Sequence, residues 1–265
     1  MPQRHIQFTI IILTLSIALE ITFLAGIITV SAALYHCLHM LFMASLIGSQ
    51  LALFFSSKGA PQRNTALWFA TGTSLTAVGD FINSAISPVQ PVSLKLTWAL
   101  ALFGAGYAIY NAVLWQYNNR LLKRSDTPFA KYRYLLALPV LAVNVLSWCQ
   151  HVQGNLQGLG LLRYGSFVFN ATIYVLMPTL GLWFFYNRRK STSGLMVLLG
   201  TLLIPYSDLI LFGSWLRGGN PAAPSFQLYA YNWILYYAGQ VLISLFPAIV
   251  MEANIAGKAE TAQNS

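Results

Sequence analysis

Hydrophobic residues occur along this chain in long, nearly unbroken runs, without the period-two alternation of half-exposed strands. A helix needs about 20 mostly apolar residues to cross a hydrocarbon core of ~30 Å. The pattern therefore predicts an all-α bundle of about eight transmembrane helices. The expected spans are residues 8–30, 33–55, 65–86, 94–117, 134–151, 162–186, 194–216 and 227–251. Residues 1–251 would form a single transmembrane domain, followed by a disordered polar tail at 252–265.

Composition supports this interpretation. The chain is 57% apolar and only 8% charged, and its mean hydropathy is +0.60. Soluble domains carry roughly a quarter charged residues. So few polar side chains would not cover a globule in water, and we expect a multi-pass protein of the cell membrane, either a plasma or an inner membrane.

The net charge of +9 could indicate a nucleic-acid partner, but the positions of the basic residues favour another explanation. With the N-terminus in the cytoplasm and eight spans, twelve of the 15 Lys and Arg residues lie on the cytoplasmic side. Lys95, Arg163 and Arg217 lie on the other side. Such a bias is the positive-inside rule. It predicts two cytoplasmic termini, basic loops that contact anionic lipid headgroups, and no nucleic-acid partner.

Three of the six acidic residues, Glu20, Asp80 and Asp208, lie inside predicted spans. A charge in hydrocarbon costs ~3 kcal/mol or more, so such residues usually face a protein interior or a wet cavity. At ~1.5 Å per residue, all three lie between the midplane and the outer half of the bilayer. They are therefore expected at one level of one cavity, although Glu20 alone can equally pair with a neighbouring helix.

Polar residues in two spans recur at three- and four-residue steps, which places each set on one helix face. The third span has Thr73, Thr76, Asp80, Asn83, Ser84 and Ser87, and the eighth has Tyr229, Asn232, Tyr236, Gln240 and Ser244. In the seventh span Pro205 precedes Asp208 by one turn and disturbs the carbonyl of Thr201. This predicts a wet pocket beside Asp208. Hydrogen bonding between helices is the alternative role of the hydroxyls and amides.

A faint internal repeat relates the two halves of the chain. GTSLTAVGD at residues 72–80 and GTLLIPYSD at 200–208 share Gly, Thr, Leu and Asp at equal spacing. With a further shift of one residue, the comparison pairs Tyr107 with Tyr236 and Asn111 with Gln240. Two parallel halves of four helices would place Asp80 and Asp208 in corresponding positions.

The segment GTLLIPYSDLILFGSWL, followed by YNWILYYAGQVLISL, resembles the C-terminal signature of the YhhN family, the lysoplasmalogenases. That family shows Ser-Asp in its penultimate span, here Ser207-Asp208, and a Tyr-Tyr-x-x-Gln-x-Leu-Ile run in the last, here beginning at Tyr236. It also has Gly-Asp in its third span, here Gly79-Asp80. The chain departs from the family twice. His39-Met40 stands where Lys-Pro is usual, and Gly106-Tyr107 lies where the fourth span usually has a histidine.

The resemblance implies cleavage of the vinyl ether bond of lysoplasmenyl-ethanolamine or -choline to a fatty aldehyde and a glycerophospho-headgroup. It implies an ether-lipid or lysophospholipid substrate, no cofactor, and Asp80 and Asp208 as the catalytic pair. The expected supporting residues are Tyr206, Ser207, Tyr236, Gln240, Asn83, Asn111, Glu20 and His39.

The residues suit this chemistry. A vinyl ether is cleaved by protonation of its β-carbon, and water then captures the oxocarbenium ion. The reaction needs a protonated acid and a nearby anion, which two carboxyl groups in contrasting surroundings supply in glycosidases. Loss of water and a second close carboxylate both favour keeping one carboxyl group protonated.

Other functions use the same residues. His36 and His39 share one helix face, as two zinc ligands would. A zinc hydrolase is nevertheless disfavoured, because no third intramembrane histidine is placed to help them. A serine hydrolase is disfavoured because the chain has no G-x-S-x-G. A proton-coupled carrier is indicated by the buried carboxylates, the repeat and Pro205. A lipid-binding protein without catalysis is the remaining alternative.

Overall fold

The computed structural model describes residues 2–60, 62–84, 86–90, 92–122, 137–152, 160–188, 191–216 and 226–252. All regular elements in these ranges are helical, which confirms the all-α prediction. They are α1 (Pro2–Leu24), α2 (Ala32–Ser56), α3 (Arg63–Asn83), α4 (Val92–Leu122), α6 (Ala137–Ser147), η1 (Trp148–Val152), α7 (Gly160–Asn170), η3 (Ala171–Leu176), α8 (Met177–Asn187), α9 (Thr192–Leu216) and α10 (Phe226–Ser244). The segments η1 and η3 are π-helical. The tail beyond Glu252 lies outside the described residues.

Six helical stretches of the described chain are long and apolar enough to cross a membrane. They are α1, α2, α4, the continuous rod formed by most of α7 with η3 and α8, α9, and α10 with the turn and the helical residues that continue it to Glu252. The other two expected spans are not among these six. The helix α3 carries a stripe of polar side chains, and the described part of the fifth expected span is limited to α6 and η1, at residues 137–152. The number of spans, about eight from the sequence, stays a prediction.

The first helix ends earlier than its apolar run suggests. Gly26 has φ +69°, its N–H donates to the carbonyl of Phe23, and the N–H of Ile27 donates to the carbonyl of Thr22, both at 3.0 Å. This is a Schellman motif, which stops a helix where glycine adopts the left-handed conformation. The helix therefore spans Pro2–Leu24 instead of residues 8–30. Glu20 consequently lies close to its end.

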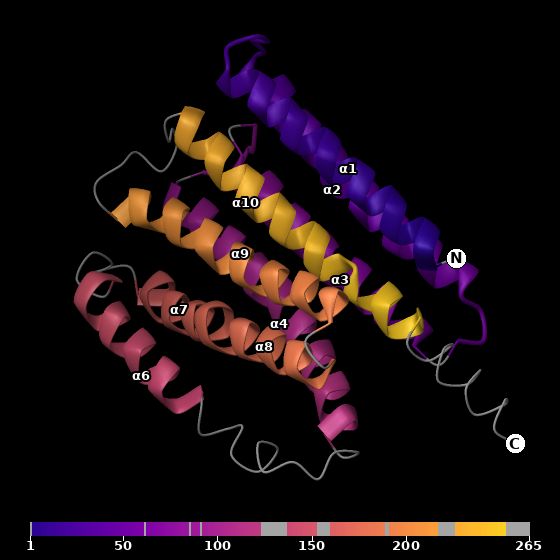
Figure 1. Cartoon of the computed structure of the whole chain (residues 1–265). Helices are drawn as coiled ribbons and strands as arrows, with labels where there is room; N and C mark the ends of the chain where they lie inside the picture. Colours follow the sequence, from indigo (N-terminus) through magenta and orange to yellow (C-terminus); the bar gives the residue numbers. More distant parts are fainter. Residues whose placement is uncertain are drawn as a thin grey trace, which may run out of the picture.

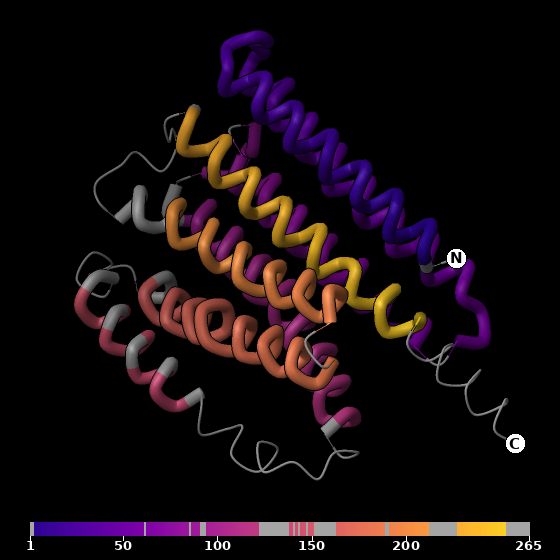
Figure 2. Tube along the Cα trace, viewed as in Figure 1, coloured from indigo at the N-terminus to yellow at the C-terminus, as the bar shows by residue number. Residues whose placement is uncertain are grey.

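The helices form one bundle in which α3 lies along α4 and α9 along α10, as Figure 1 shows. α2 packs on α3, α8 packs on α4 and α9, and α1 lies beside α2 and α10. α6 stands at one edge, next to η3 and η1 (Figure 2). The beginning of α1 and the end of α10 lie at the same end of the bundle (Figure 1).

Two close helix crossings rest on glycines. A Cβ atom on Gly106 of α4 would lie 2.7 Å from the carbonyl oxygen of Gly72 on α3. A Cβ atom on Gly200 of α9 would lie 2.6 Å from the backbone nitrogen of Ile243, beside Gly239 on α10. Small residues let helix backbones approach this closely. Since Gly72 and Gly200 match in the sequence repeat, each half contributes one crossing of the same kind.

The crossings favour a different register for the fourth and last helices from the one in the sequence comparison. The packing makes Gly239 the counterpart of Gly106. In this register Tyr107 corresponds to Gln240, whereas the sequence comparison pairs Tyr107 with Tyr236. Full superposition of the two halves stays a prediction.

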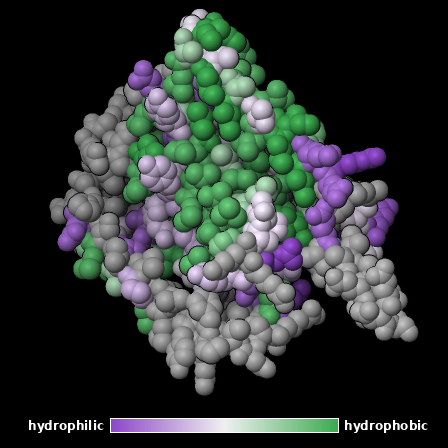
Figure 3. Space-filling model, in the orientation of Figure 1, coloured by the Kyte–Doolittle hydropathy of each residue, from purple (hydrophilic) through white to green (hydrophobic). Residues whose placement is uncertain are grey.

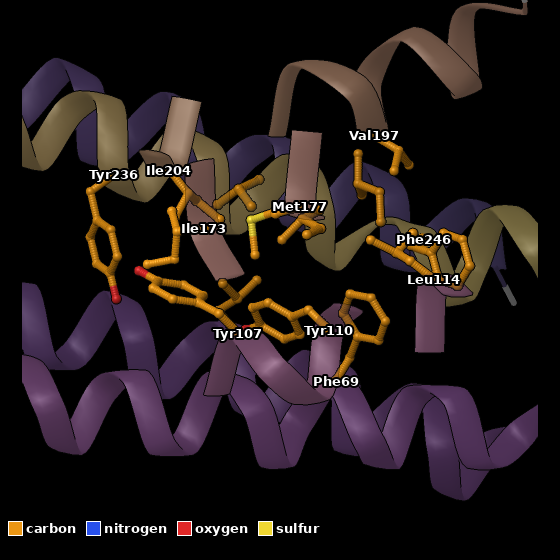
Figure 4. Packing of buried hydrophobic residues seen from close by; sticks show 14 of the residues in the cluster. Phe69, Tyr107, Tyr110, Leu114, Ile173, Met177, Val197, Ile204, Tyr236 and Phe246 are labelled. Atoms are coloured by element: carbon orange, nitrogen blue, oxygen red, sulfur yellow. The ribbon is translucent and has the colours of Figure 1, made fainter. Parts of the chain in front are cut away.

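A cluster of buried aromatic and aliphatic side chains fills the space between α3, α4, η3, α9 and α10 (Figure 4). Tyr107, Tyr110 and Tyr236 are part of this cluster and are almost fully buried. Buried tyrosine hydroxyls normally find hydrogen-bond partners. They therefore bring polar chemistry into the middle of the bundle. The outer surface is largely hydrophobic on the face that Figure 3 shows, as expected of a surface that contacts lipid.

Candidate active site

The two polar stripes predicted from residue spacing face each other across the bundle. The hydroxyl of Tyr236 on α10 donates to Oδ2 of Asp80 on α3 at 2.8 Å. One turn along each helix, the amide of Gln240 lies 3.5 Å from the hydroxyl of Thr76. Asp80 is half-buried, whereas Gln240 and Thr76 are fully buried. The structure thus brings Asp80, Tyr236 and Gln240 together, as the sequence predicts.

A buried hydrogen-bond network supports this contact. The hydroxyl of Tyr110 on α4 donates to Oε1 of Gln240 at 3.0 Å. The hydroxyls of Tyr110 and Thr73 lie 2.7 Å apart, and either oxygen is placed to donate to the other. The same Thr73 oxygen lies 3.2 Å from Oε1 of Gln50 on α2. The network connects four helices and orients the Gln240 amide toward Thr76.

Asp208 approaches the site from α9. It is 5% exposed, and its Oδ2 has no hydrogen-bond partner within the described part of the chain. It lies close enough to Asp80 and Tyr107 to interact with both electrostatically. The hydroxyl of Tyr107 is likewise buried without a described partner. In Figure 4 this hydroxyl points toward the side where Tyr236 lies. Buried unsatisfied groups of this kind mark places where water or a ligand binds.

The π-helical segment η3 borders the same region. It forms the middle of the rod, between α7 and α8 and just before Pro178. It places Tyr174 within electrostatic range of Asp208. The amide of Asn111 on α4 donates to the carbonyl of Thr172 in η3 at 3.1 Å. Short π-helical segments are frequent at functional sites. Asn111, predicted as a supporting residue, therefore braces η3.

Glu20 and His39 form a second cluster beside the first. His39 Nε2 lies 2.6 Å from one oxygen of Glu20, and the hydroxyl of Tyr35 donates to the other at 2.6 Å. Glu20 and His39 are fully buried. The imidazole stacks flat on Trp233, with ring centroids 3.8 Å apart, and Trp233 lies 5.7 Å from the ring of Tyr236. The second cluster thus contacts the Asp80 region through α10.

Three of the predicted supporting residues have other surroundings. Tyr206 is 55% exposed on the outer face, because two residues along a helix turn it about 200° away from Asp208. The hydroxyl of Ser207 donates to the carbonyl of Ile204 in its own helix at 2.8 Å. Asn83 is the last residue of α3 and is half-buried.

No three His, Cys, Asp or Glu side chains are grouped to hold a metal ion among the residues that the structure describes. The rings of His36 and His39 lie 6.3 Å apart, but Nε2 of His39 contacts Glu20. One groove of the described surface lies between α1 and α2, and another lies between α4, α7 and η3. Neither is lined by an aspartate. The wet pocket beside Asp208 therefore stays a prediction.

Sequence reasoning missed Tyr35 and Trp233 as members of this region, and it named Tyr229 only as part of the polar stripe of the eighth span. The hydroxyl of Tyr229 lies 3.3 Å from Nδ1 of His36, and Tyr229 is within electrostatic range of both Glu20 and Asp80. A usable signal was present, since Tyr229, Trp233 and Tyr237 recur every four residues on the same face of α10.

No curated protein and no solved structure matches this chain. The model of the YhhN family matches residues 32–246. The matched region contains both aspartates, Tyr236 and Gln240, and it leaves out α1 with Glu20. Because the match extends over most of its length, the chain belongs to the YhhN family.

Proposed function

We propose that this protein is a membrane-embedded hydrolase that cleaves the vinyl ether bond of lysoplasmalogens, with Asp80 and Asp208 as its catalytic pair. The observation that carries the proposal is the contrast between the surroundings of two carboxyl groups inside the bundle, one on α3 and one on α9. Asp80 accepts a hydrogen bond from Tyr236, whereas Oδ2 of Asp208 has no partner among the described groups. Two carboxyl groups in such different surroundings can serve as one protonated acid and one anion. Membership in the YhhN family is consistent with this activity.

The roles follow from the hydrogen bonds. A donated hydroxyl stabilises a carboxylate, so Asp80 is the anion that faces the developing positive charge. Asp208 is the acid, and it transfers its proton to the β-carbon of the vinyl ether. Water then adds to the oxocarbenium carbon and gives up a proton to a carboxylate of the pair. The hemiacetal collapses to an aldehyde and the glycerol hydroxyl, with one water consumed.

Tyr107 has a place in this reaction. Its hydroxyl is within electrostatic range of both aspartates, and no described group bonds to it. A tyrosine hydroxyl both donates and accepts, so it suits the water that attacks the cation. The water would then lie between Tyr107 and the pair, ready to lose its proton to a carboxylate.

The test is aldehyde release from lysoplasmenylethanolamine by the purified protein in detergent. Asp80→Asn and Asp208→Asn should each lower the rate about 100-fold or more, as expected for loss of an acid or base. Glu252→Gln, which changes an acidic residue at the end of the described chain, should keep the native rate. Gel filtration and thermal unfolding show whether each variant is folded. Native rates in both aspartate variants, or no aldehyde from the folded native protein, would overturn the proposal.

A proton-coupled carrier is the second candidate. The matched glycine crossings of α3 with α4 and of α9 with α10 favour it, since many carriers are built from repeats around buried carboxylates. A carrier would concentrate lysolipid across the membrane of proteoliposomes in response to a proton gradient and would release no aldehyde. The hydrolase would release aldehyde without a gradient.

A further inference from the structure

Lys95 is a buried cation in the first turn of α4. It is 8% exposed, and its ammonium group donates to the backbone carbonyl of Ser84, just beyond α3. Within the described ranges, no carboxylate forms an ion pair with it. Buried charges are normally paired with an opposite charge. Lys95 therefore has a hydrogen-bond partner in the described chain but no counter-charge there.

A second basic side chain approaches Lys95 from another helix. His36 of α2 is also buried, and it lies within electrostatic range of Lys95 and of His39. Its Nδ1 lies 3.3 Å from the hydroxyl of Tyr229 on α10. The acidic groups near this cluster are Glu20 and Asp80, which interact with Tyr229. Glu20 is already bonded to His39, so an anion bound beside Lys95 and His36 would supply the opposite charge that Lys95 lacks within the described ranges.

The position of Lys95 relative to Asp80 indicates which anion fits. Ser84, whose carbonyl holds Lys95, follows Asp80 by one helical turn, about 6 Å along the axis. In a lysoplasmalogen, six bonds separate the vinyl ether carbon from phosphorus, which is about 7 Å when extended like two residues of backbone. A phosphate at Lys95 would therefore place the vinyl ether beside Asp80.

We propose that Lys95 and His36, assisted by Tyr229, bind the phosphate of the lysophospholipid headgroup and so set which lipids reach the aspartates. This subsite rests on the proposed hydrolase, because it positions the bond that the aspartates cleave. It predicts discrimination between phosphate-bearing lipids and neutral lipids with the same chain.

A structural role for Lys95 is the competing explanation. A lysine that donates to a carbonyl at the end of α3 also stabilises that helix end. Loss of a purely structural contact would weaken binding of every lipid alike. Loss of a phosphate contact would weaken only lipids that carry phosphate.

The experiment measures binding, so that it is independent of turnover. Ester-linked lysophosphatidylethanolamine, which has no vinyl ether, is titrated into the full chain in non-ionic detergent and followed by calorimetry. Monoacylglycerol with the same chain and inorganic phosphate are titrated in parallel. Lys95→Met should weaken lysophosphatidylethanolamine at least tenfold and leave monoacylglycerol unchanged, and Lys95→Arg should recover part of the loss. Arg163→Met, which removes a cation at the start of α7, should change neither.

Three results would overturn the subsite. They are equal weakening of both lipids, no weakening of either, and binding of inorganic phosphate as tight as that of the lysophospholipid. If Lys95→Met does not fold, His36→Phe replaces it, with the same expected selectivity for the phosphate-bearing lipid. If the native protein releases no aldehyde but the binding difference is found, the phosphate subsite stands and the hydrolase proposal fails.

Discussion

Removal of the Tyr236 hydroxyl isolates the contact that distinguishes Asp80 from Asp208. Tyr236→Phe keeps the ring, which packs edge-on against Phe103 at 6.2 Å and beside Trp233 at 5.7 Å. The lost hydrogen bond is 2.8 Å long and reaches a carboxyl oxygen. Hydrogen bonds to charged groups contribute about 1.5–3 kcal/mol. Because 1.36 kcal/mol is a factor of ten in rate, we expect kcat/KM to fall by about 10- to 150-fold.

The neighbouring residue supplies a matched control. Tyr237 is also buried on α10, and its hydroxyl donates to the backbone carbonyl of Phe42 at 3.1 Å. Tyr237→Phe therefore removes the same atom from the same helix and should cost about 1 kcal/mol of stability, whereas loss of the bond to the carboxylate in Tyr236→Phe should cost about 1.5–3 kcal/mol. The two assays are aldehyde release from lysoplasmenylethanolamine and thermal unfolding in detergent.

The two variants should separate activity from stability. We expect both variants to remain folded with lowered unfolding temperatures, near-native kcat/KM in Tyr237→Phe and the large loss of kcat/KM only in Tyr236→Phe. If Tyr236→Phe retains native kcat/KM, the hydrogen bond to Asp80 does not contribute to catalysis. If both variants lose activity in proportion to their unfolding temperatures, packing of α10 explains the effect and the assigned role of Tyr236 is refuted.

Two further predictions concern stability in detergent. Gly200→Ala should destabilise the protein by about 1–3 kcal/mol, since a Cβ atom there would lie 2.6 Å from the backbone nitrogen of Ile243. Gly48→Ala, where the added atom meets open space, should leave the unfolding temperature unchanged, and equal effects would contradict the close crossing. Glu20→Gln should cost about 1.5–3 kcal/mol because it replaces the charged acceptor of His39 and Tyr35 by a neutral amide. A double-mutant cycle with His39→Gln should show strong coupling, whereas additive losses would show that the two residues act independently.

The contact between Asp80 and Tyr236 could be predicted from the sequence because helical spacing defines a face. Polar residues at three- and four-residue steps in an otherwise apolar span have few alternatives to facing another polar face. Spacing also has a limit. Tyr206 is adjacent to the Ser207-Asp208 motif, but a helix directs near neighbours in sequence to different sides. Tyr206 therefore lies outside the site although it is next to the motif in the sequence.

The pairing of Glu20 with His39 depended on a register that hydrophobicity alone does not contain. Apolar residues such as Ile27 extend the first run beyond the helix end, so the predicted span placed Glu20 too far from the turn into the next helix. The Schellman motif at Gly26 stops α1 at Leu24. Glu20 and His39 then reach similar depths in two antiparallel neighbours, which brings their side chains into contact.

This pairing also gives the histidine of the second helix a buried partner. The resemblance to the family predicts a lysine at the position of His39, and a buried imidazole without a partner would be costly. Its partner, Glu20, comes from α1, which lies outside the region that the family model matches. Trp233 covers the face of the same imidazole from within the matched region. We infer that His39 and α1 depend on each other. Without α1, the buried imidazole would lose its bond to Glu20, and without His39, the buried carboxylate of Glu20 would lose its bond to the imidazole.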